Sequence, residues 1–348
     1  MSSGWDARVD AELDGIRAAG RWRVTRDLTT TGPVTGQVEG RSVVTFASND
    51  YLGLTHHPAV VAAAHAALDR WGAGSGASRL VVGSRPLHAE LEAELAAWKG
   101  TEAALLFPTG FAANLGLLAT LGGAGVTIVS DELNHASIVD GARLARAGVR
   151  VVRHGDLDHL AKLLVDTGAE ARGPAVVVTD SAFSMDGDVA DIDGLVEACA
   201  GRDALLVLDE AHAVLGPDVA IGRAASHHGV TVLRMGTLSK ARGSLGGFVA
   251  GPQRYVDLLR NRARPFIFTT APTPADVAAG LAAVRIVRSG EGDALVARLR
   301  RHVDRVRAAR LREFPSYFAH WVDCVQNNKE PVCSGEEGRA SLEVLLAG

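Results

Sequence analysis

The sequence is short of cysteine and of long apolar runs. Its 348 residues include three cysteines, Cys199, Cys324 and Cys333, which are too few for the disulfide framework of a secreted scaffold. No apolar run approaches the roughly 18–20 residues that span a bilayer. The first ten residues lack the charged start and apolar centre of a signal peptide. These absences predict a cytoplasmic chain with reduced thiols.

Positive charge is not in excess either. The 36 basic and 40 acidic residues give a net charge of −4, which favours neither nucleic acid nor an anionic membrane as a partner. With 47% hydrophobic residues and 39 glycines, the composition is that of a globular protein. The length suggests two domains, or one large α/β unit with an appendage.

Lysine is rare, and one lysine has an unusual setting. Only Lys99, Lys162, Lys240 and Lys329 occur among the 36 basic residues. Arginine can replace lysine in most surface roles, but its guanidinium stays protonated and cannot serve as an amine nucleophile. Lys240 lies in a polar, glycine-flanked segment directly after an apolar run, and it is therefore the first candidate for covalent chemistry.

From about residue 100 to 250, short apolar runs alternate with segments long enough for amphipathic helices. This alternation is typical of a mostly parallel sheet covered by helices on both faces. The sequence therefore predicts an α/β fold with seven strands, near residues 103–107, 126–129, 149–152, 175–178, 205–208, 232–235 and 248–250. Helices are expected at 111–121, 137–147, 157–164 and 192–200.

The two ends of the chain have a different pattern. We expect a helix at 5–19, a strand at 43–47 and a helix at 58–71 before the sheet, and one long helix at 274–312 after it. The residues beyond 314 hold two of the three cysteines and a Gln-Asn-Asn-Lys run. This shift in composition predicts a domain boundary near Phe314.

Several predicted strands end in residues that suit ligand binding, which in open α/β sheets occurs at the carboxyl ends of strands. Gly110 and Phe111 open a helix after one strand, where free N–H groups favour phosphate. Asp209 and His212 follow another strand, Lys240 a third, and His135 a fourth. A phosphate turn, a flat side chain, a carboxylate for a pyridine nitrogen and an amine for an aldehyde together fit pyridoxal 5′-phosphate.

Two other enzyme classes share parts of this pattern. The letters DEAH at 209–212 occur in helicases, but those need a phosphate loop of the form GxxxxGK[ST], which is absent from this sequence. A dehydrogenase should begin with GxGxxG after a strand, and the glycines at 72, 74 and 76 have the wrong spacing. A protein that folds and binds the cofactor without turnover remains an alternative.

With these residues in view, the chain resembles the α-oxoamine synthases, which are pyridoxal-phosphate enzymes of the aspartate-aminotransferase fold (fold type I). The resemblance runs from about residue 8 to 310, and eight motifs in order carry it. They are 48–54 (SNDYLGL), 74–79 (GSGASR), 109–114 (TGFAAN), 134–137 (NHAS), 183–188 (FSMDGD), 209–212 (DEAH), 236–240 (GTLSK) and 264–268 (RPFIF).

The resemblance implies a role for each matching residue. Lys240 would bind the cofactor as a Schiff base and later move the α-proton of the substrate. His135 would stack on the ring, Asp209 would pair with its nitrogen, and His212 and Ser184 would contact its 3′ oxygen side. The other implied residues are Gly110, Phe111 and Thr237 for the phosphate, Thr270 reaching in from a partner subunit, Arg23 for the substrate, and Asn49 near the substrate entrance. No metal is implied.

The implied reaction is a decarboxylative condensation by a homodimer with shared active sites. Within the family, the chain is most similar to the branch that joins L-alanine to a pimeloyl thioester, on coenzyme A or acyl carrier protein, and makes 8-amino-7-oxononanoate for biotin. Sister activities of the glycine C-acetyltransferase and 5-aminolevulinate synthase type remain alternatives.

The sequence departs from the family in two places. Arg242 stands where the family has an apolar residue beside the cofactor lysine, and nothing after Arg312 resembles the family's C-terminal domain. Residues 314–348 instead resemble the C-terminal end of NAD-dependent sugar and inositol dehydrogenases. We therefore expect an N-terminal segment (1–57), a large cofactor-binding domain (58–285), a linking helix (286–313) and an atypical tail (314–348), with reduced activity.

Overall fold

A computed structural model describes residues 4–32, 34–170, 173–214 and 228–306. By its contacts the chain divides into two units, Met1–Phe46 and Ala47–Gly348. The predicted tail and the last residues of the predicted linking helix lie outside the described residues, so the four-part division proposed from the sequence stays a prediction. Within the described part, no helix is both long and apolar enough to cross a membrane.

The first unit holds one helix and a small antiparallel sheet. Helix α1 (Gly4–Ala18) confirms the helix expected there, and the strands β1 (Thr29–Thr30), β2 (Thr35–Val38) and β3 (Arg41–Val44) pair in that order. Glu39 and Gly40 both have positive φ, as a two-residue hairpin turn requires. The strand expected at 43–47 therefore begins and ends earlier than predicted, because this turn fixes its pairing with β2.

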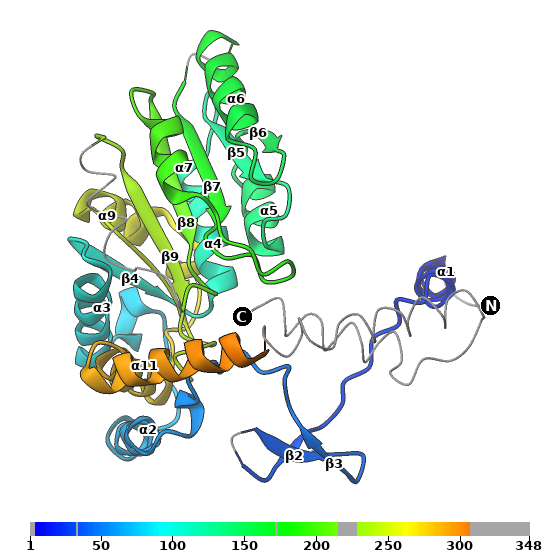
Figure 1. Cartoon of the computed structure of the whole chain (residues 1–348), viewed down its shortest axis with the longest axis vertical. Helices are drawn as coiled ribbons and strands as arrows, with labels where there is room; N and C mark the ends of the chain where they lie inside the picture. The colour runs from blue at the N-terminus through cyan, green and yellow to red at the C-terminus, as the bar shows by residue number, and fades with distance from the viewer. Residues whose placement is uncertain (1–3, 33, 171–172, 215–227, 307–348) are drawn as a thin grey trace. The chain divides into compact units, whose positions relative to one another are not determined.

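The second unit is built on a seven-stranded, mostly parallel sheet, which confirms the predicted fold class (Figure 1). Strands β5 to β9 are parallel, and β10 runs antiparallel between β9 and β4. In spatial order the strands are β4 (Ala103–Phe107), β10 (Gly247–Gly251), β9 (Val232–Thr237), β8 (Ala204–Asp209), β7 (Ala175–Asp180), β5 (Thr127–Asp131) and β6 (Gly148–Val152).

Helices cover both faces of the sheet because alternate strand residues point to opposite sides. In β7, Val176 and Val178 join one apolar core while Ala175 and Val177 join another. The first core is closed by α4 (Gly110–Leu121), α5 (Ala136–Leu144), α9 (Gln253–Arg262) and α10 (Arg264–Ile267). The opposite face is covered by α6 (Leu157–Glu170), α7 (Ile192–Cys199), α3 (Pro86–Lys99) and α11 (Pro274–Val287).

Three further elements complete this unit. They are the 3₁₀ turn η1 (Leu54–His56), α2 (Pro58–Trp71) and the π-helical turn η2 (Arg79–Gly83). Helix α2 confirms the helix expected at those residues.

One long helix was predicted at 274–312, and this prediction is wrong. Helix α11 ends at Val287, and a second helical segment begins at 290 and continues to 306. Ser289 causes the interruption because its Oγ atom donates to the Ile286 carbonyl (2.7 Å) and accepts from the Glu291 main-chain N–H (3.2 Å). A serine that bonds in this way ends one helix and caps the next.

Candidate active site

The candidate site lies at the carboxyl edge of the large sheet. Strand β10 is antiparallel to both β4 and β9, and its first residue, Gly247, pairs with Phe107 and with Thr237. The ends of β4 and β9, and the segments that follow them, are therefore neighbours. This is the edge at which open α/β sheets bind ligands.

Lys240 lies in the turn that joins β9 to β10. The Gly243 main-chain N–H donates to the Lys240 carbonyl (3.0 Å). Gly243 has a φ of +57°, and a Cβ atom at this position would lie 2.4 Å from the main-chain nitrogen of Thr55. The turn is thus packed directly on the backbone of η1, and glycine is required where the two meet.

A chain of hydrogen bonds leads away from the Lys240 amine. Its Nζ atom lies 2.6 Å from His212 Nε2, and His212 Nδ1 lies 2.8 Å from the Tyr51 hydroxyl. The Tyr51 hydroxyl donates its only proton to Asn49 Oδ1 (2.9 Å), so its oxygen accepts from His212 Nδ1. His212 Nε2 then carries the lone pair, and it can accept a hydrogen bond from the Lys240 amine.

Burial favours the neutral forms of both groups in this contact. Burial lowers the pKa of the Lys240 amine, although the charges of Asp209 and Asp180 oppose the shift. Burial, followed by the positive charges of Lys240 and His135, lowers the pKa of His212 to about 3. His212 is therefore neutral at physiological pH, and the Lys240 amine more readily takes the unprotonated form that attacks an aldehyde.

Asp209, at the end of β8, is 2% exposed and accepts two hydrogen bonds. Asn114 Nδ2 donates to its Oδ2 (2.8 Å), and the Ala211 main-chain N–H donates to its Oδ1 (2.9 Å). Asn114 also donates to Ser137 Oγ (2.8 Å), and Ser137 Oγ lies 2.7 Å from His135 Nδ1. A single set of bonds therefore orients both Asp209 and His135, the carboxylate and the flat side chain of the prediction.

A second carboxylate, Asp180, ends the neighbouring strand β7 and pairs in register with Asp209. Its Oδ2 atom accepts the His135 main-chain N–H (2.8 Å). Burial, followed by the negative charge of Asp209, raises the pKa of Asp180 to about 8. Burial also raises the pKa of Asp209, although its bond from Asn114 opposes this. The site therefore has an excess of buried carboxylate.

The start of α4 meets two hydroxyl groups. The Thr109 side chain caps this helix, and a Cβ atom added to Gly110 would lie 3.3 Å from Thr237 Cβ and 3.4 Å from its Oγ1. Thr237 Oγ1 is 2.8 Å from Ser239 Oγ. A helix N-terminus with hydroxyls beside it favours a phosphate-sized anion, and Thr237 can lie this close to the helix start because Gly110 has no side chain.

Four of the predicted residues take no part in the hydrogen bonds described above. Ser184 lies partly buried in the loop after β7, Phe111 is 43% exposed in the first turn of α4, and Thr270 is exposed after α10. Arg23 is exposed between α1 and β1, in the other unit. The structure therefore connects Lys240, His212 and Asn49, joins Asp209 to His135, and places Gly110 against Thr237. The role of every predicted site residue, including the other four, stays a prediction.

Five side chains of the cluster received no role from the sequence. Two had usable signals: Asp180 ends its strand as Asp209 does, and Ser239 precedes the rare lysine by one residue. The others, Tyr51, Asn114 and Ser137, lie inside motifs of the resemblance, but only their contacts reveal what they do.

Lys99, another of the rare lysines, has a structural role. Its Nζ atom pairs with Glu210 Oε2 (2.9 Å), and Arg234 Nη2 pairs with Glu210 Oε1 (2.6 Å), with all three side chains at most 1% exposed. Glu210 directly follows Asp209, so this buried ion cluster fixes the end of β8. A buried charge persists only with such partners.

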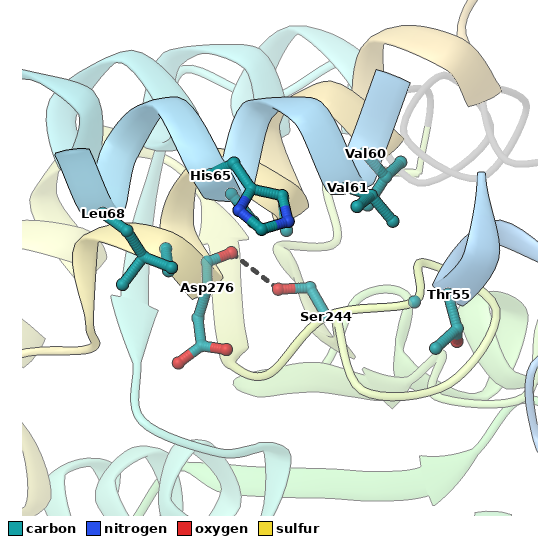
Figure 2. A pocket seen from close by; sticks show the side chains of 11 residues that line it. Thr55, Val60, Val61, His65, Leu68, Ser244 and Asp276 are labelled. Carbon is teal, nitrogen blue, oxygen red and sulfur yellow. Dashed lines mark hydrogen bonds between the residues drawn. The ribbon is translucent and has the colours of Figure 1, made fainter. Parts of the chain in front are cut away.

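A separate cavity of about 250 Å³ lies between α2, α11 and the turn after Lys240 (Figure 2). Figure 2 shows Val60, Val61 and Leu68 on one side of it, and the Ser244 hydroxyl donating to the Asp276 carbonyl (2.6 Å). Lys240, His212, Tyr51, Asp209 and His135 do not line this cavity. Its polar contacts instead attach the end of the lysine turn to α11.

Comparison with known proteins shows which family this chain matches. The model of the family described as aminotransferase class I and II matches residues 41–324. The 8-amino-7-oxononanoate synthase of Methylobacterium sp. (strain 4-46) is 49% identical over 286 residues, covering 82% of this chain and 73% of that protein.

The chain is also similar to solved structures. Serine palmitoyltransferase from S. paucimobilis, with a pyridoxal-phosphate–myriocin aldimine bound, has a TM-score of 0.73 and 30% identity, covering 81% of this chain and 74% of that one. The 8-amino-7-oxononanoate synthase from Francisella tularensis has a TM-score of 0.64 and 26% identity, covering 77% of this chain and 75% of that one.

Proposed function

Because the chain belongs to the aminotransferase class I and II family, we propose that it is a pyridoxal-phosphate-dependent acyltransferase that forms 8-amino-7-oxononanoate from L-alanine and a pimeloyl thioester in biotin biosynthesis. A relative 49% identical over 82% of this chain bears the name of that enzyme. The structural observation that carries the proposal is the 2.6 Å contact between Lys240 Nζ and His212 Nε2 at the edge that also holds Asp209.

The residues at this edge fit the cofactor. When bound, pyridoxal phosphate supplies an aldehyde that condenses with amines and a protonated ring that withdraws electrons from the carbon beside the amino nitrogen. Asp209 would pair with the ring nitrogen, and that positive charge would offset the excess of buried carboxylate at Asp209 and Asp180. His135 would lie on the ring, oriented by Ser137.

Lys240 would have two tasks. Its amine, with a pKa lowered by burial, would hold the cofactor and would later remove the α-proton of alanine. His212 Nε2 would accept a hydrogen bond from that amine while Nδ1 donates to Tyr51, so the imidazole orients the lysine without becoming charged itself. Because His212 stays neutral, the Lys240 amine has no second cation beside it from this ring and more readily takes the unprotonated form that removes a proton.

Phosphate binding is assigned to the start of α4. Gly110 and Phe111 would offer main-chain N–H groups, and Thr237 would offer its hydroxyl. The Thr237 hydroxyl donates to the Gly246 carbonyl (2.9 Å), so it would turn its proton to the phosphate on binding, and Ser239 Oγ, 2.8 Å away, is placed to orient it. We assign Ser184 to the 3′ oxygen side of the ring, as the resemblance implies.

Substrate binding is assigned to Asn49 and Arg23. Asn49 accepts from the Tyr51 hydroxyl, so it lies at the outer end of the bond chain that starts at Lys240, and an incoming amino acid would meet it before the amine. Arg23 offers a guanidinium for a carboxylate. The acyl donor would be a pimeloyl thioester of coenzyme A or of acyl carrier protein, carriers that are found in the cytoplasm.

We also propose that two copies of the chain associate and share their sites, with Thr270 of one copy completing the phosphate site of the other. Exposed apolar side chains on η2 and directly after α10 support this proposal: Val81 is 72% exposed, Val82 71% and Phe268 69%. Surfaces of this kind mark protein interfaces. Sedimentation velocity of the purified chain should give a dimer, and Val82→Asp should shift the population to monomer.

The test of the proposed activity is product formation from a panel of substrates. The chain, supplied with pyridoxal phosphate, should release carbon dioxide and form 8-amino-7-oxononanoate from alanine with pimeloyl-coenzyme A, while Lys240→Arg should form none. Serine with palmitoyl-coenzyme A, glycine with acetyl-coenzyme A and glycine with succinyl-coenzyme A serve as comparisons. A faster reaction with any of these three would replace the proposed substrate pair.

A further inference from the structure

His154, just after β6, bridges two carboxylates that lie far apart in the sequence. Its Nδ1 atom is 3.0 Å from Asp131 Oδ1, at the end of β5, and its Nε2 atom is 2.7 Å from Asp188 Oδ2. Its ring and the Phe183 ring are nearly perpendicular, with 4.5 Å between their centroids. Ionised carboxylates only accept hydrogen bonds, so an imidazole that serves both must donate from both nitrogens and is an imidazolium.

Asp188 and Phe183 belong to the loop that follows β7, residues 181–190. This loop closes on itself, because the Phe183 N–H donates to the Asp188 carbonyl (3.0 Å) and the Ala190 N–H donates to the Ser181 carbonyl (3.1 Å). Ser181 joins it to the site, since both its N–H (2.8 Å) and its hydroxyl (2.9 Å) donate to the Asp209 carbonyl.

The loop therefore has one anchor at Asp209 and another at His154. The second anchor is firmly built: Asp131 also accepts from the main-chain N–H groups of Leu133 (2.9 Å) and Gly155 (3.2 Å). Its side chain is only 8% exposed, whereas that of Asp188 is 46% exposed. Asp131 is thus the fixed side of the bridge, and Asp188 is the side that can detach.

We infer that His154 is a positioning residue for the cofactor site: as an imidazolium between Asp131 and Asp188 it fastens the 181–190 loop, which carries Ser181 and Ser184, beside Asp209, and it releases the loop when the ring loses its proton. The inference rests on the proposed function in one respect, namely that Asp209 and Ser184 contact pyridoxal phosphate. The bridge itself is a feature of the chain alone.

The charges around His154 favour the bridged state. Burial is the largest single influence and lowers the pKa of His154, but the hydrogen bonds and charges of Asp131 and Asp188 together raise it above the ordinary value. Other charged or titratable groups lie around it. Glu132 Oε1 accepts the main-chain N–H of His154 (2.9 Å), and the rest are the Arg153–Asp156 pair, His159 and Asp191.

The sign of the pH dependence follows from this direction. A histidine whose pKa is raised by folding stabilises the folded form fully below its unfolded pKa, and this stabilisation is lost as the pH rises through the folded pKa. The loop should therefore be fastened in mildly acidic solution and should loosen as the pH rises through the His154 pKa.

Hydrogen exchange of the chain without cofactor tests the bridge. Peptides covering 181–190 are measured by mass spectrometry from pH 5.5 to 8.5 in wild type, His154→Gln and His65→Gln, the last a control histidine exposed on α2. After correction for intrinsic exchange, the 181–190 peptides of wild type and of His65→Gln should lose protection as the pH rises, and both should follow the same titration curve. His154→Gln should exchange about tenfold faster at pH 6, as expected for the loss of a charged hydrogen bond, and should show no titration.

A second variant moves the titration without removing the histidine. Asp188→Asn deletes one charge at a half-exposed position, so the chain still folds, and the midpoint of the titration should fall by about one pH unit. An unchanged midpoint, or protection in His154→Gln equal to that in His65→Gln at pH 6, would overturn the inference.

The dissociation constant of pyridoxal phosphate at pH 6, measured by absorbance, links the bridge to the site. It should increase about tenfold in His154→Gln and remain unchanged in His65→Gln, and equal constants in both variants would contradict the positioning role. If wild type shows the exchange titration but binds no pyridoxal phosphate, the proposed function fails and the bridge stands.

Discussion

The Nζ atom of Lys240 lies 2.6 Å from the Nε2 atom of His212, and the other ring nitrogen of His212 lies 2.8 Å from the Tyr51 hydroxyl. Burial lowers the pKa of His212 to about 3 and raises the pKa of Tyr51 to about 12. Both groups therefore stay neutral at any working pH, and they orient the lysine through hydrogen bonds and not through charge.

Tyr51→Phe should slow the reaction without unfolding the chain. The change leaves the partly buried Nδ1–H of His212 without its acceptor, which costs about 1–3 kcal/mol. Where that cost falls on the orientation of Lys240 in the reaction, kcat should drop by roughly 5- to 150-fold. Tyr255→Phe, at a partly buried position on α9, is the matched control. Steady-state kinetics and thermal melting of both variants provide the comparison, and equal kcat values would contradict the role given to Tyr51.

Asp180→Asn should stabilise the cofactor-free chain at alkaline pH. The pKa of Asp180 is raised to about 8, first by burial and then by Asp209, so the folded chain holds a proton that the unfolded chain releases near pH 4. Its contribution to stability is therefore present below about pH 4 and is lost as the pH rises towards 8. The asparagine does not ionise and avoids this loss.

The measurement is the melting temperature of wild type and Asp180→Asn from pH 4 to 9, with Asp69→Asn on the exposed side of α2 as the control. The difference between Asp180→Asn and wild type should be small at pH 4 and should grow in favour of the variant up to pH 8. A difference independent of pH would show that Asp180 is ionised in the folded chain.

Gly243→Ala should cost more stability than the same change at another glycine of positive φ. Gly125 has a φ of +84° and nothing within 4 Å of an added Cβ atom, so Gly125→Ala isolates the cost of the left-handed conformation, about 1–2 kcal/mol. At Gly243 the added atom would also overlap the backbone of Leu54 and Thr55.

Urea denaturation should therefore give a loss for Gly243→Ala at least twice that for Gly125→Ala. Because the overlap displaces the turn that holds Lys240, the variant should also bind pyridoxal phosphate more weakly, whereas Gly125→Ala should bind it normally. Equal losses of stability would mean that the lysine turn is not packed on η1.

The sheet and its site edge could be predicted from the sequence because their signals are local. Each apolar run overlaps one strand, and the helix-length segments between most of the runs favour parallel pairing. The strand predicted at 175–178 is two residues shorter than β7, because Thr179 and Asp180 are polar and do not belong to the apolar run. Asp180 was missed for this reason, although its register partner Asp209 was found.

Contacts between distant segments could not be predicted in this way. Tyr51 and His212 are 161 residues apart, and their meeting depends on the packing of η1 against the lysine turn. The bridge from Asp131 through His154 to Asp188 depends likewise on the order of β5, β6 and β7 in the sheet. The break at Ser289 is local and did have a signal, because Gly290 and Gly292 follow the serine and such clusters mark turns, but the apolar pattern on both sides of them favoured one continuous helix.

The central claim, that Lys240 holds the cofactor, is tested most directly by borohydride reduction. Wild type, Lys240→Arg and Lys162→Arg, the last on the exposed side of α6, are incubated with pyridoxal phosphate, reduced, digested and mapped by mass spectrometry. Wild type and Lys162→Arg should carry the phosphopyridoxyl mass on the peptide that contains Lys240, and Lys240→Arg should carry none. A label on the Lys99 or Lys162 peptide of wild type, with the Lys240 peptide unmodified, would contradict the account.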